Sequence, residues 1–459
     1  MKIKLIAPHD VSPDSISSAQ TFAIQKANLP LLAALTPTEH EVTIVDEVFD
    51  ADDTSEDVDL VGITVMTDLA LRAYQIADAY RKDGVKVVMG GIHPTVLPGE
   101  ALQHADAVVI GEADTIWTKL LSDAASGKMQ KLYRAGACAN LAGMPIPRRD
   151  LYPKRTSDSF TPLATGMETG RGCPYNCEFC SVGSVMGHRY RMRPAHEVIA
   201  EIASAGNSKL FFVDDALAVN RAAARRLFQE MIPLGLKWAG QGHVALAEEL
   251  DLLRLMKRSG CVGLLIGFES VQKELVGGMP KITSLRIGYE EAVRRFHGEG
   301  IALLGAFVFG FDHQTPEVFD QTFEFSLKNR LDAVELRILT PFPGTRLYSR
   351  LLKEDRMYSP DWWLHGYPAD TLLFHPKSMA PDQLVDGFVA LNRQIYSVNA
   401  ILKRFLGMSP KRRGAFGCSV YAGLNWATRR RYFRGIGIPQ PFVKWAESNG
   451  NLAVCGGCR

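Results

Sequence analysis

The segment 170–181 reads Gly170-Arg171-Gly172-Cys173-Pro174-Tyr175-Asn176-Cys177-Glu178-Phe179-Cys180-Ser181. Its cysteines follow the spacing Cys-x3-Cys-x2-Cys. Three thiolates at this spacing can hold three irons of a [4Fe–4S] cluster, whereas a cluster that only carries electrons usually has four cysteine ligands. The fourth iron is then open and can bind a substrate directly. A structural zinc site would prefer four closed ligands in Cys-x2-Cys pairs. The spacing therefore predicts an iron–sulfur cluster on Cys173, Cys177 and Cys180, which are also the predicted catalytic residues.

The composition of the 459 residues, 46% apolar and 22% charged, is typical of a soluble globular protein with two or three domains. A net charge of +2 argues against general nucleic-acid binding. A basic stretch at residues 411–413, 429–431 and 434 leaves open a peripheral membrane contact, an anionic substrate or a solvated face. We find no apolar run of membrane-spanning length and no signal-peptide pattern, so we expect a cytoplasmic protein. Eight cysteines in a chain of this length do not indicate a disulfide framework.

The first 135 residues alternate short β-branched runs with helical patterns, which predicts an α/β, doubly wound, Rossmann-like domain. The expected strands are 2–8, 41–47, 60–66, 86–91 and 107–112. Ligands of such domains lie at the carboxyl ends of the strands. Here these ends carry Thr64, Gly90, Gly91 and Gly111, and a glycine lets the backbone approach a bulky cofactor closely. The alternative is a Rossmann fold that binds nothing.

A proline-containing linker is expected at 136–160, before a second strand and helix alternation at 161–355. Its six expected strands, 163–168, 209–214, 237–243, 263–269, 303–311 and 333–339, predict a partial (β/α)6 barrel of the TIM type with its site at the strand ends. Polar residues follow those strands: Asp214, Asp215, Gln241, His243, Glu269, Asp312, His313 and Thr340. His243 is open between a proton donor and a core histidine. The segment 356–459 is expected to form a mainly helical C-terminal domain, with one amphipathic helix over 383–406 and a Cys455-x-x-Cys458 tail.

The cysteine segment resembles the signature of the radical S-adenosylmethionine (SAM) enzymes, in which SAM occupies the open iron. The resemblance implies that Phe179 packs against the adenine, that the Gly263–Glu269 element, with Gly267 and Glu269, lies beside it, and that Asp214 lies near the SAM amino group. Glu269 falls one residue early for the family pattern.

The loops of the first domain, together with this signature, resemble the cobalamin (B12)-dependent radical SAM proteins, and among them the class B C-methyltransferases. In this family Thr64 and the pair Gly90-Gly91 would flank the nucleotide tail of B12, and Gly111 is expected to belong to the same cobalamin site. No Asp-x-His-x-x-Gly follows the first strand, so no protein histidine is expected to bind cobalt. His9 and His93 are expected to be hydrogen-bonding loop residues.

The resemblance implies that an external reductant of the flavodoxin or ferredoxin type passes one electron through the cluster to SAM. The resulting 5′-deoxyadenosyl radical removes a hydrogen atom from an unactivated carbon, and cobalamin supplies the methyl group. The substrate is expected to be a small molecule or a lipid such as a hopanoid, with no nucleic acid involved. Three alternatives stay open: a B12-dependent radical cyclisation or rearrangement, a cobalamin-free transfer of another part of SAM to a soft acceptor such as arsenic at Cys455 and Cys458, and an iron–sulfur or B12 sensor.

Overall fold

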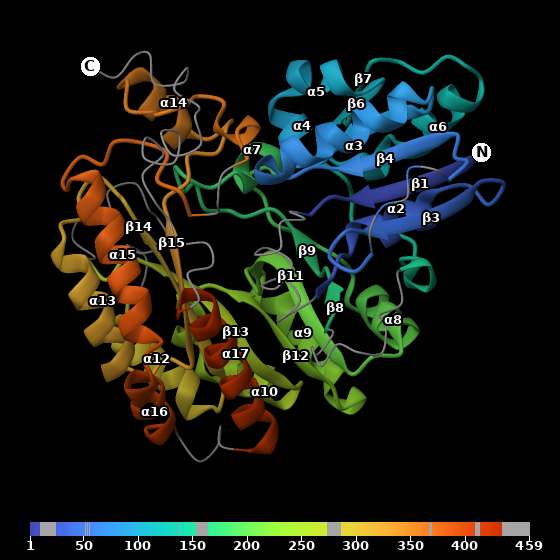
Figure 1. The fold of residues 1–459 in the computed structure, drawn as a ribbon. Helices are drawn as coiled ribbons and strands as arrows, with labels where there is room; N and C mark the ends of the chain where they lie inside the picture. Colours follow the sequence, from blue (N-terminus) through green and yellow to red (C-terminus); the bar gives the residue numbers. More distant parts are fainter. Residues whose placement is uncertain are drawn as a thin grey trace. The chain divides into compact units, whose positions relative to one another are not determined.

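A computed structural model of the chain describes residues 1–9, 24–50, 52, 54, 56–136, 138–152, 164–272, 286–366, 370–408 and 414–433. The chain divides into two compact units (Figure 1). The first comprises residues 1–174, 181–214 and 363–365, and the second comprises residues 175–180, 215–362 and 366–459. The domain boundaries at 135, 160 and 355 stay predictions.

The first unit contains a parallel sheet of six strands in the order β3-β1-β4-β5-β6-β7. The strands are β1 (Lys2–Ala7), β3 (Glu41–Asp46), β4 (Leu60–Thr64), β5 (Lys86–Gly90), β6 (Ala107–Ile110) and β7 (Leu132–Arg134). The five strands expected from the sequence are present, and β7 is an additional short edge strand. The order reverses between β1 and β4, because β3 and β4 pair with opposite edges of β1. In doubly wound sheets this reversal marks the place where ligands bind.

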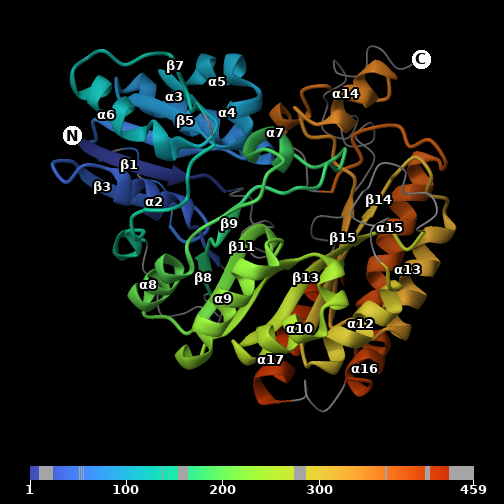
Figure 2. The same ribbon diagram turned by 180° about the vertical axis from the view of Figure 1, so that it is seen from behind.

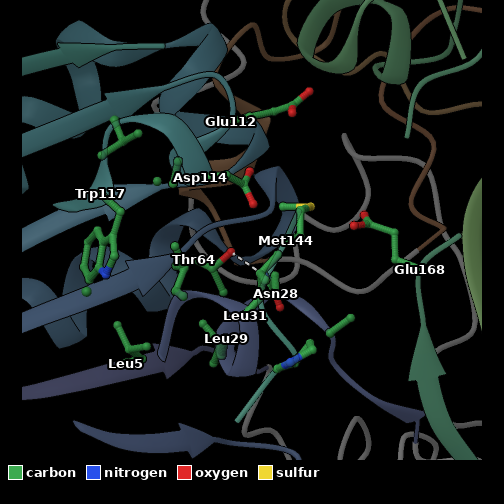
Figure 3. Close-up of a pocket in the computed structure, with 18 of the residues that line it drawn as sticks. Leu5, Asn28, Leu29, Leu31, Thr64, Glu112, Asp114, Trp117, Met144 and Glu168 are labelled. Atoms are coloured by element: carbon green, nitrogen blue, oxygen red, sulfur yellow. Dashed lines mark hydrogen bonds between the residues drawn. The ribbon is translucent and has the colours of Figure 1, made fainter. Parts of the chain in front are cut away.

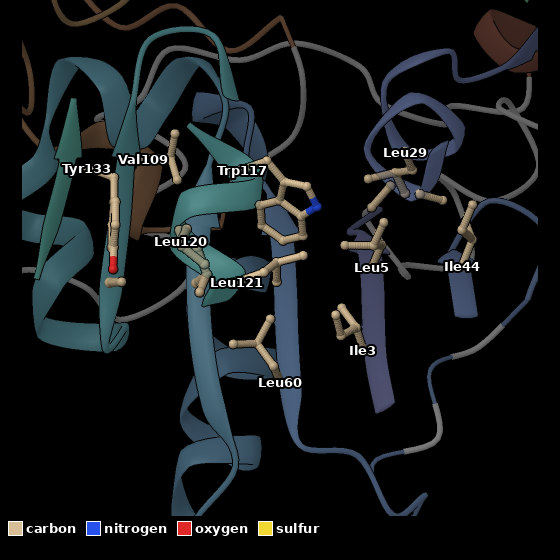
Figure 4. Close-up of a cluster of buried hydrophobic side chains, with 14 of the residues drawn as sticks. Ile3, Leu5, Leu29, Ile44, Leu60, Val109, Trp117, Leu120, Leu121 and Tyr133 are labelled. Carbon is tan, nitrogen blue, oxygen red and sulfur yellow. The ribbon is translucent and has the colours of Figure 1, made fainter. Parts of the chain in front are cut away.

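Helices cover both faces of this sheet. They are α2 (Asn28–Leu35), α3 (Ala70–Lys82), α4 (Ile92–Val96), α5 (Pro98–His104) and α6 (Trp117–Ala125). Leu5 and Leu29 are buried with Trp117 in one core cluster under α2 and α6 (Figure 4). The Trp117 indole Nε1 donates to Thr36 Oγ1 at 2.9 Å, so the one polar atom of this buried ring has a hydrogen-bond partner. Lys4 extends to the other face, where its ammonium donates to the Tyr80 hydroxyl of α3 at 2.9 Å.

The second sheet has seven strands in the order β15-β14-β13-β12-β11-β8-β2. They are β2 (Ile24–Gln25), β8 (Ala164–Met167), β11 (Lys209–Leu217), β12 (Lys237–Gly242), β13 (Cys261–Glu269), β14 (Ala302–Phe309) and β15 (Ala333–Ile338). All six strands expected for the partial barrel are present, and β2 adds an unexpected edge strand that pairs in parallel with β8. Residue 163, the expected start of the first of them, lies outside the described residues.

Helices alternate with these strands, as a (β/α) architecture requires (Figure 2). They are α8 (Ala195–Ala205), α9 (Arg221–Met231), α10 (Leu250–Arg258), α12 (Tyr289–Gly298) and α13 (Glu317–Lys328). On α10, for example, Leu252 and Met256 are fully buried while Arg254 is exposed. A short antiparallel pair, β9 (Gly170–Arg171) and β10 (Arg191–Met192), flanks the cysteine segment.

The C-terminal region is helical, with α14 (Arg346–Lys353), α15 (Pro381–Ile395), α16 (Val398–Leu406) and α17 (Ala415–Phe433). The prediction of a single helix over 383–406 is wrong, because the helix is interrupted between α15 and α16, at Ser397. Ser397 takes an extended conformation, and its hydroxyl accepts a hydrogen bond from the Ala400 N–H as the N-cap of α16. In the described part of the chain, every helix is too short or too polar to span a membrane.

Candidate cofactor sites

A cavity of about 190 Å³ opens in the first unit at the carboxyl ends of β4, β5 and β6 (Figure 3). Its wall includes Thr64, Gly90, Gly91 and Gly111, the four residues singled out in the sequence, together with apolar side chains of α2 and α6. Thr64 Oγ1 accepts a hydrogen bond from Asn28 Nδ2 at 3.1 Å. The structure therefore brings the predicted cobalamin residues together at one cavity.

Gly90 and Gly91 contribute to this site in different ways. A Cβ built on Gly90 would meet only the Val109 Cβ, at 3.7 Å, which is an ordinary contact distance. The space that a side chain at position 90 would fill is part of the cavity. Gly91 has a φ of +104°, and a Cβ there would lie 2.9 Å from both the N and the O of Val65. The fold itself requires glycine at 91, whereas at 90 glycine keeps the cavity open.

A buried ionic network joins the β6 end to the β9 strand, all within the first unit. Arg171 Nη1 donates to Asp114 at 2.5 Å and to Glu112 at 3.2 Å, and its Nε donates to Glu168 at 2.9 Å. Burial opposes the Arg171 charge, but Glu168 and Asp114 outweigh it and raise the pKa of the guanidinium. Arg191 also donates to Glu112, at 2.9 Å. These pairs hold the chain two residues before Cys173.

Glu168 lines the same cavity directly after the end of β8. Burial raises the pKa of Glu168 to about 7; Arg171 opposes the shift, and the Asp214 carboxylate adds to it. The group thus changes protonation near neutral pH. Glu168 was not predicted as a site residue, although an acidic residue at the end of a barrel strand, just ahead of the cysteine segment, is a signal visible in the sequence.

The cysteine segment carries thiols suited to an iron–sulfur cluster. Cys173 and Cys177 are buried and Cys180 is half-buried. Within the described residues, no three His, Cys, Asp or Glu side chains are grouped closely enough to hold a metal ion. Three soft thiol donors on one short loop nevertheless fit three irons of a cluster. Cys180 N donates to Cys177 O at 3.3 Å, a turn that keeps the last two cysteines near each other.

Helix α14 anchors the part of the loop that lies in the second unit. Arg346 donates to the Asn176 carbonyl at 2.6 Å, and the Leu347 N–H donates to the Glu178 carbonyl at 2.9 Å. Arg350 donates to the Glu178 carboxylate at 3.0 Å and to Asp312 at 2.5 Å. We name these contacts of Arg346, Leu347 and Arg350 the α14 clamp. No sequence signal marks it, because its residues lie about 170 positions beyond the loop.

Phe179 and the Gly267–Glu269 element lie in the second unit. The Phe179 ring meets the Phe311 ring edge to face, with centroids 5.7 Å apart. Glu269, the last residue of β13, is buried and has a φ of +62°, a strained conformation for a residue with a side chain. A Cβ on Gly267 would lie 2.5 Å from Glu269 Oε1. Glycine at 267 therefore makes room for the Glu269 carboxylate at the strand end.

Asp214 does not end its strand as expected, because β11 continues to Leu217. Asp214 is only 1% exposed, and its carboxylate accepts hydrogen bonds from the Thr169 N–H at 2.7 Å and the Tyr190 hydroxyl at 2.9 Å. The Thr169 hydroxyl donates to it as well. These contacts fix the turn that precedes the cysteine segment.

His9, His93 and His243 each take part in a hydrogen bond. His93 is fully buried and hydrogen-bonded, with its Nε2 2.8 Å from the Tyr74 hydroxyl and 3.0 Å from Glu100. It lies in the first turn of α4 rather than in a loop, and the Trp363 ring packs against it. The His9 backbone N–H donates to Glu47. His243 Nδ1 accepts from the Ala245 N–H at 3.2 Å. Cys455 and Cys458 lie outside the described residues.

Three protein families match successive parts of the chain. Residues 27–121 match the B12 binding domain, residues 167–326 match the radical SAM superfamily, and residues 345–415 match a domain of unknown function (DUF4070). Fold and sites thus define a radical SAM enzyme that carries a B12-binding domain.

Similar proteins of known name narrow the class of enzyme to methyltransferases. The bacteriochlorophyllide d C-12(1)-methyltransferase of Chlorobaculum tepidum is 32% identical over 394 residues, which are 83% of this chain and 84% of that protein. The hopanoid C-2 methylase of Rhodopseudomonas palustris is 25% identical over 82% of this chain and 72% of that protein. The chain belongs to the family of B12-dependent radical SAM methyltransferases.

A solved structure has the same fold. TsrM, a radical SAM methyltransferase from Kitasatospora setae solved with cobalamin and a [4Fe–4S] cluster bound, superimposes with a TM-score of 0.67 at 18% identity, covering 95% of this chain and 99% of that chain. The cofactors of this family are a [4Fe–4S] cluster, SAM and cobalamin, as the sequence analysis expected.

Proposed function

We propose that this methyltransferase acts on a tetrapyrrole and methylates an unactivated carbon of one of its substituents. The observation that carries the proposal is the 32% identity to a bacteriochlorophyllide d methyltransferase over 83% of this chain and 84% of that protein. When bound, the cluster supplies the electron that cleaves SAM, and cobalamin supplies the methyl group. The protein's own task is to bind and orient these groups and the substrate.

Each cofactor has a proposed set of residues. Thr64, Gly90 and Gly111 line the cavity for cobalamin, and Cys173, Cys177 and Cys180 hold the cluster. Phe179, Gly267 and Glu269 are proposed to contact SAM, which the strained, buried Glu269 at a barrel strand end supports. For Asp214 the three hydrogen bonds to Thr169 and Tyr190 support a positioning role in the turn before Cys173.

The electron source is proposed to be an external one-electron reductant of the flavodoxin or ferredoxin type in a reducing cytoplasm. Such a donor would supply the electron that a cluster held by Cys173, Cys177 and Cys180 would pass to SAM.

The test is an anaerobic assay of the reconstituted protein with flavodoxin, SAM carrying a trideuterated methyl group, and bacteriochlorophyllide d. Mass spectrometry should find the pigment carrying the labelled methyl group. A variant with Cys173, Cys177 and Cys180 replaced by Ala serves as the control and should leave the pigment unchanged. The proposal is wrong if the wild-type protein releases 5′-deoxyadenosine in the presence of other candidate substrates yet never labels a tetrapyrrole.

A second candidate substrate is a polycyclic lipid, favoured by the 25% identity to the hopanoid C-2 methylase. The same assay with a hopanoid in detergent distinguishes the two, since only the true substrate should gain the label.

A further inference from the structure

Charge is distributed very unevenly along the chain. Between Asp386 and Glu447 the sequence contains eleven lysines and arginines and no aspartate or glutamate. The whole chain has 52 basic and 50 acidic residues, so 41 basic and 50 acidic residues remain elsewhere, a net charge of −9. A protein that is nearly neutral overall thus carries one strongly cationic region, and this region contains α16 and α17.

The same two helices expose an unusual share of large apolar side chains. In the described part of the chain ten large hydrophobic residues are exposed, and five of them lie on α16 and α17. On α16 these are Val398, Leu402 and Leu406, at 44%, 50% and 70% exposure. Their spacing of four residues places them along one side of the helix. On α17 they are Trp426 at 59% and Phe433 at 49%, seven residues apart and so on one face.

Helices α16 and α17 are neighbours within the second unit, and they lie side by side at its lower end in Figures 1 and 2. The Tyr421 hydroxyl donates to the Ile401 carbonyl at 2.7 Å, and Arg404 donates to Asn425 at 2.9 Å. The buried sides of both helices are therefore fixed. We give the name α16–α17 surface to the side chains that the two helices leave exposed, Val398, Leu402, Lys403, Leu406, Trp426, Arg430 and Phe433, together with the half-buried Arg429.

Arginine and aromatic rings are interleaved on this surface. The Arg429 guanidinium lies 4.0 Å from the Phe433 ring centroid and 5.9 Å from that of Trp426. Its Nη1 also donates to the Tyr396 carbonyl at 2.9 Å, which ties it to the body of the unit. Lys403 and Arg430 are exposed beside the apolar residues. Trp426 and Phe433 remain 59% and 49% exposed beside the Arg429 guanidinium, so both rings are accessible.

We propose that the α16–α17 surface docks the enzyme on an anionic lipid bilayer. Exposed Leu, Trp and Phe gain by entering the boundary between headgroups and acyl chains, while Lys and Arg beside them attract anionic headgroups. A second copy of the chain is a poorer occupant, since a symmetric contact would bring two cationic surfaces together. Nucleic acid explains the charge but not the stripe of Val398, Leu402 and Leu406, because phosphate contacts come from polar and basic groups.

Vesicle flotation of the full-length protein tests the proposal. Vesicles of phosphatidylcholine mixed with phosphatidylglycerol should float the protein, vesicles of phosphatidylcholine alone should float much less, and added salt should release it. Leu402→Ser with Leu406→Ser should lower the partition coefficient about tenfold, since it removes apolar contact with the bilayer. Lys403→Gln with Arg430→Gln should abolish the preference for anionic vesicles.

Matched controls are Leu234→Ser, an exposed leucine on another element, and Arg254→Gln, an exposed arginine of α10. Both should bind like wild type. All substituted side chains are exposed, so circular dichroism should show an unchanged fold. The proposal fails if the protein floats equally with both vesicle types or with neither, if the Leu402 and Leu406 variant binds like the controls, or if a DNA oligonucleotide is bound with the same dependence on Leu402 and Leu406.

Discussion

Gly90 and Gly91 stand side by side at the end of β5, and the structure separates their roles. Gly91 has a backbone conformation and a contact with Val65 that a side chain would disturb, whereas Gly90 has only the cavity in front of it. The two glycines look equivalent in the sequence, because the contact of Gly91 with the Val65 backbone arises only when β4 and β5 are paired.

At the residue scale we predict that Gly90→Leu fills the cavity, and that the purified protein then takes up little cobalamin while its melting temperature stays near wild type. Gly91→Ala should instead lower the free energy of unfolding by about 1–3 kcal/mol, the usual cost of a strained backbone. Cobalamin absorbance after reconstitution and thermal unfolding measure the two effects. Gly99→Ala, where a Cβ meets nothing within 4 Å, is the control. Full cobalamin uptake by Gly90→Leu would show that the cofactor lies elsewhere.

At the scale of elements, the α14 clamp shows how a distant helix positions the cysteine loop. Burial opposes the charge of Arg350, but the Glu178 and Asp312 carboxylates outweigh it and raise the pKa of the guanidinium. Burial also opposes the charge of Asp312, but Arg356 and Arg350 outweigh it and lower the pKa of that carboxyl, so the Arg350–Asp312 pair keeps both charges at physiological pH. Helix α14 begins at the start of the domain of unknown function matched at 345–415. In this chain the first helix of that segment therefore contacts the cysteine loop, at Asn176 and Glu178.

We predict that Arg350→Gln loosens this loop, since it removes charge-assisted hydrogen bonds worth about 1.5–3 kcal/mol. The reconstituted protein should bind less iron, and the electron paramagnetic resonance signal of its reduced cluster should change. Glu178→Gln should act in the same direction, and the double variant should add little to either single change. Arg254→Gln is the control. A variant at Arg350 with wild-type iron content and an unchanged spectrum would contradict the positioning role.

Local patterns predicted most of the elements. The strands and the cysteine run are visible because spacing and β-branched runs act over a few residues. The edge strands β2 and β7 were missed because they contain only two and three residues and depend on tertiary pairing. Serine is a common N-cap residue, so Ser397 could have indicated the start of a new helix. The apolar periodicity that continues across it favoured one long helix instead. Asp214 was predicted to end its strand because the apolar run stops at Val213, whereas β11 continues through Asp214 and Asp215 to Leu217.

At the scale of the whole molecule, the sequence predicted the cofactors from two motifs in the right order along the chain, and the B12 binding and radical SAM matches confirm both. Substrate choice had no such local signal, because pockets for apolar molecules are assembled from residues far apart in the chain. The basic residues at 411–413, 429–431 and 434 marked a cationic region in the sequence, whereas the exposed apolar side chains of α16 and α17 became evident only in the structure.

The central claim is that Cys173, Cys177 and Cys180 hold the cluster that cleaves SAM in a cobalamin-dependent methyltransferase. The most direct measurement is iron, cobalt and 5′-deoxyadenosine in anaerobically reconstituted protein supplied with SAM and a reductant. Wild type should bind about four irons per chain, take up cobalamin and release 5′-deoxyadenosine. The variant with all three cysteines replaced by Ala should keep cobalamin and lose both the iron and the product. Continued reductive cleavage of SAM by that variant would contradict the account.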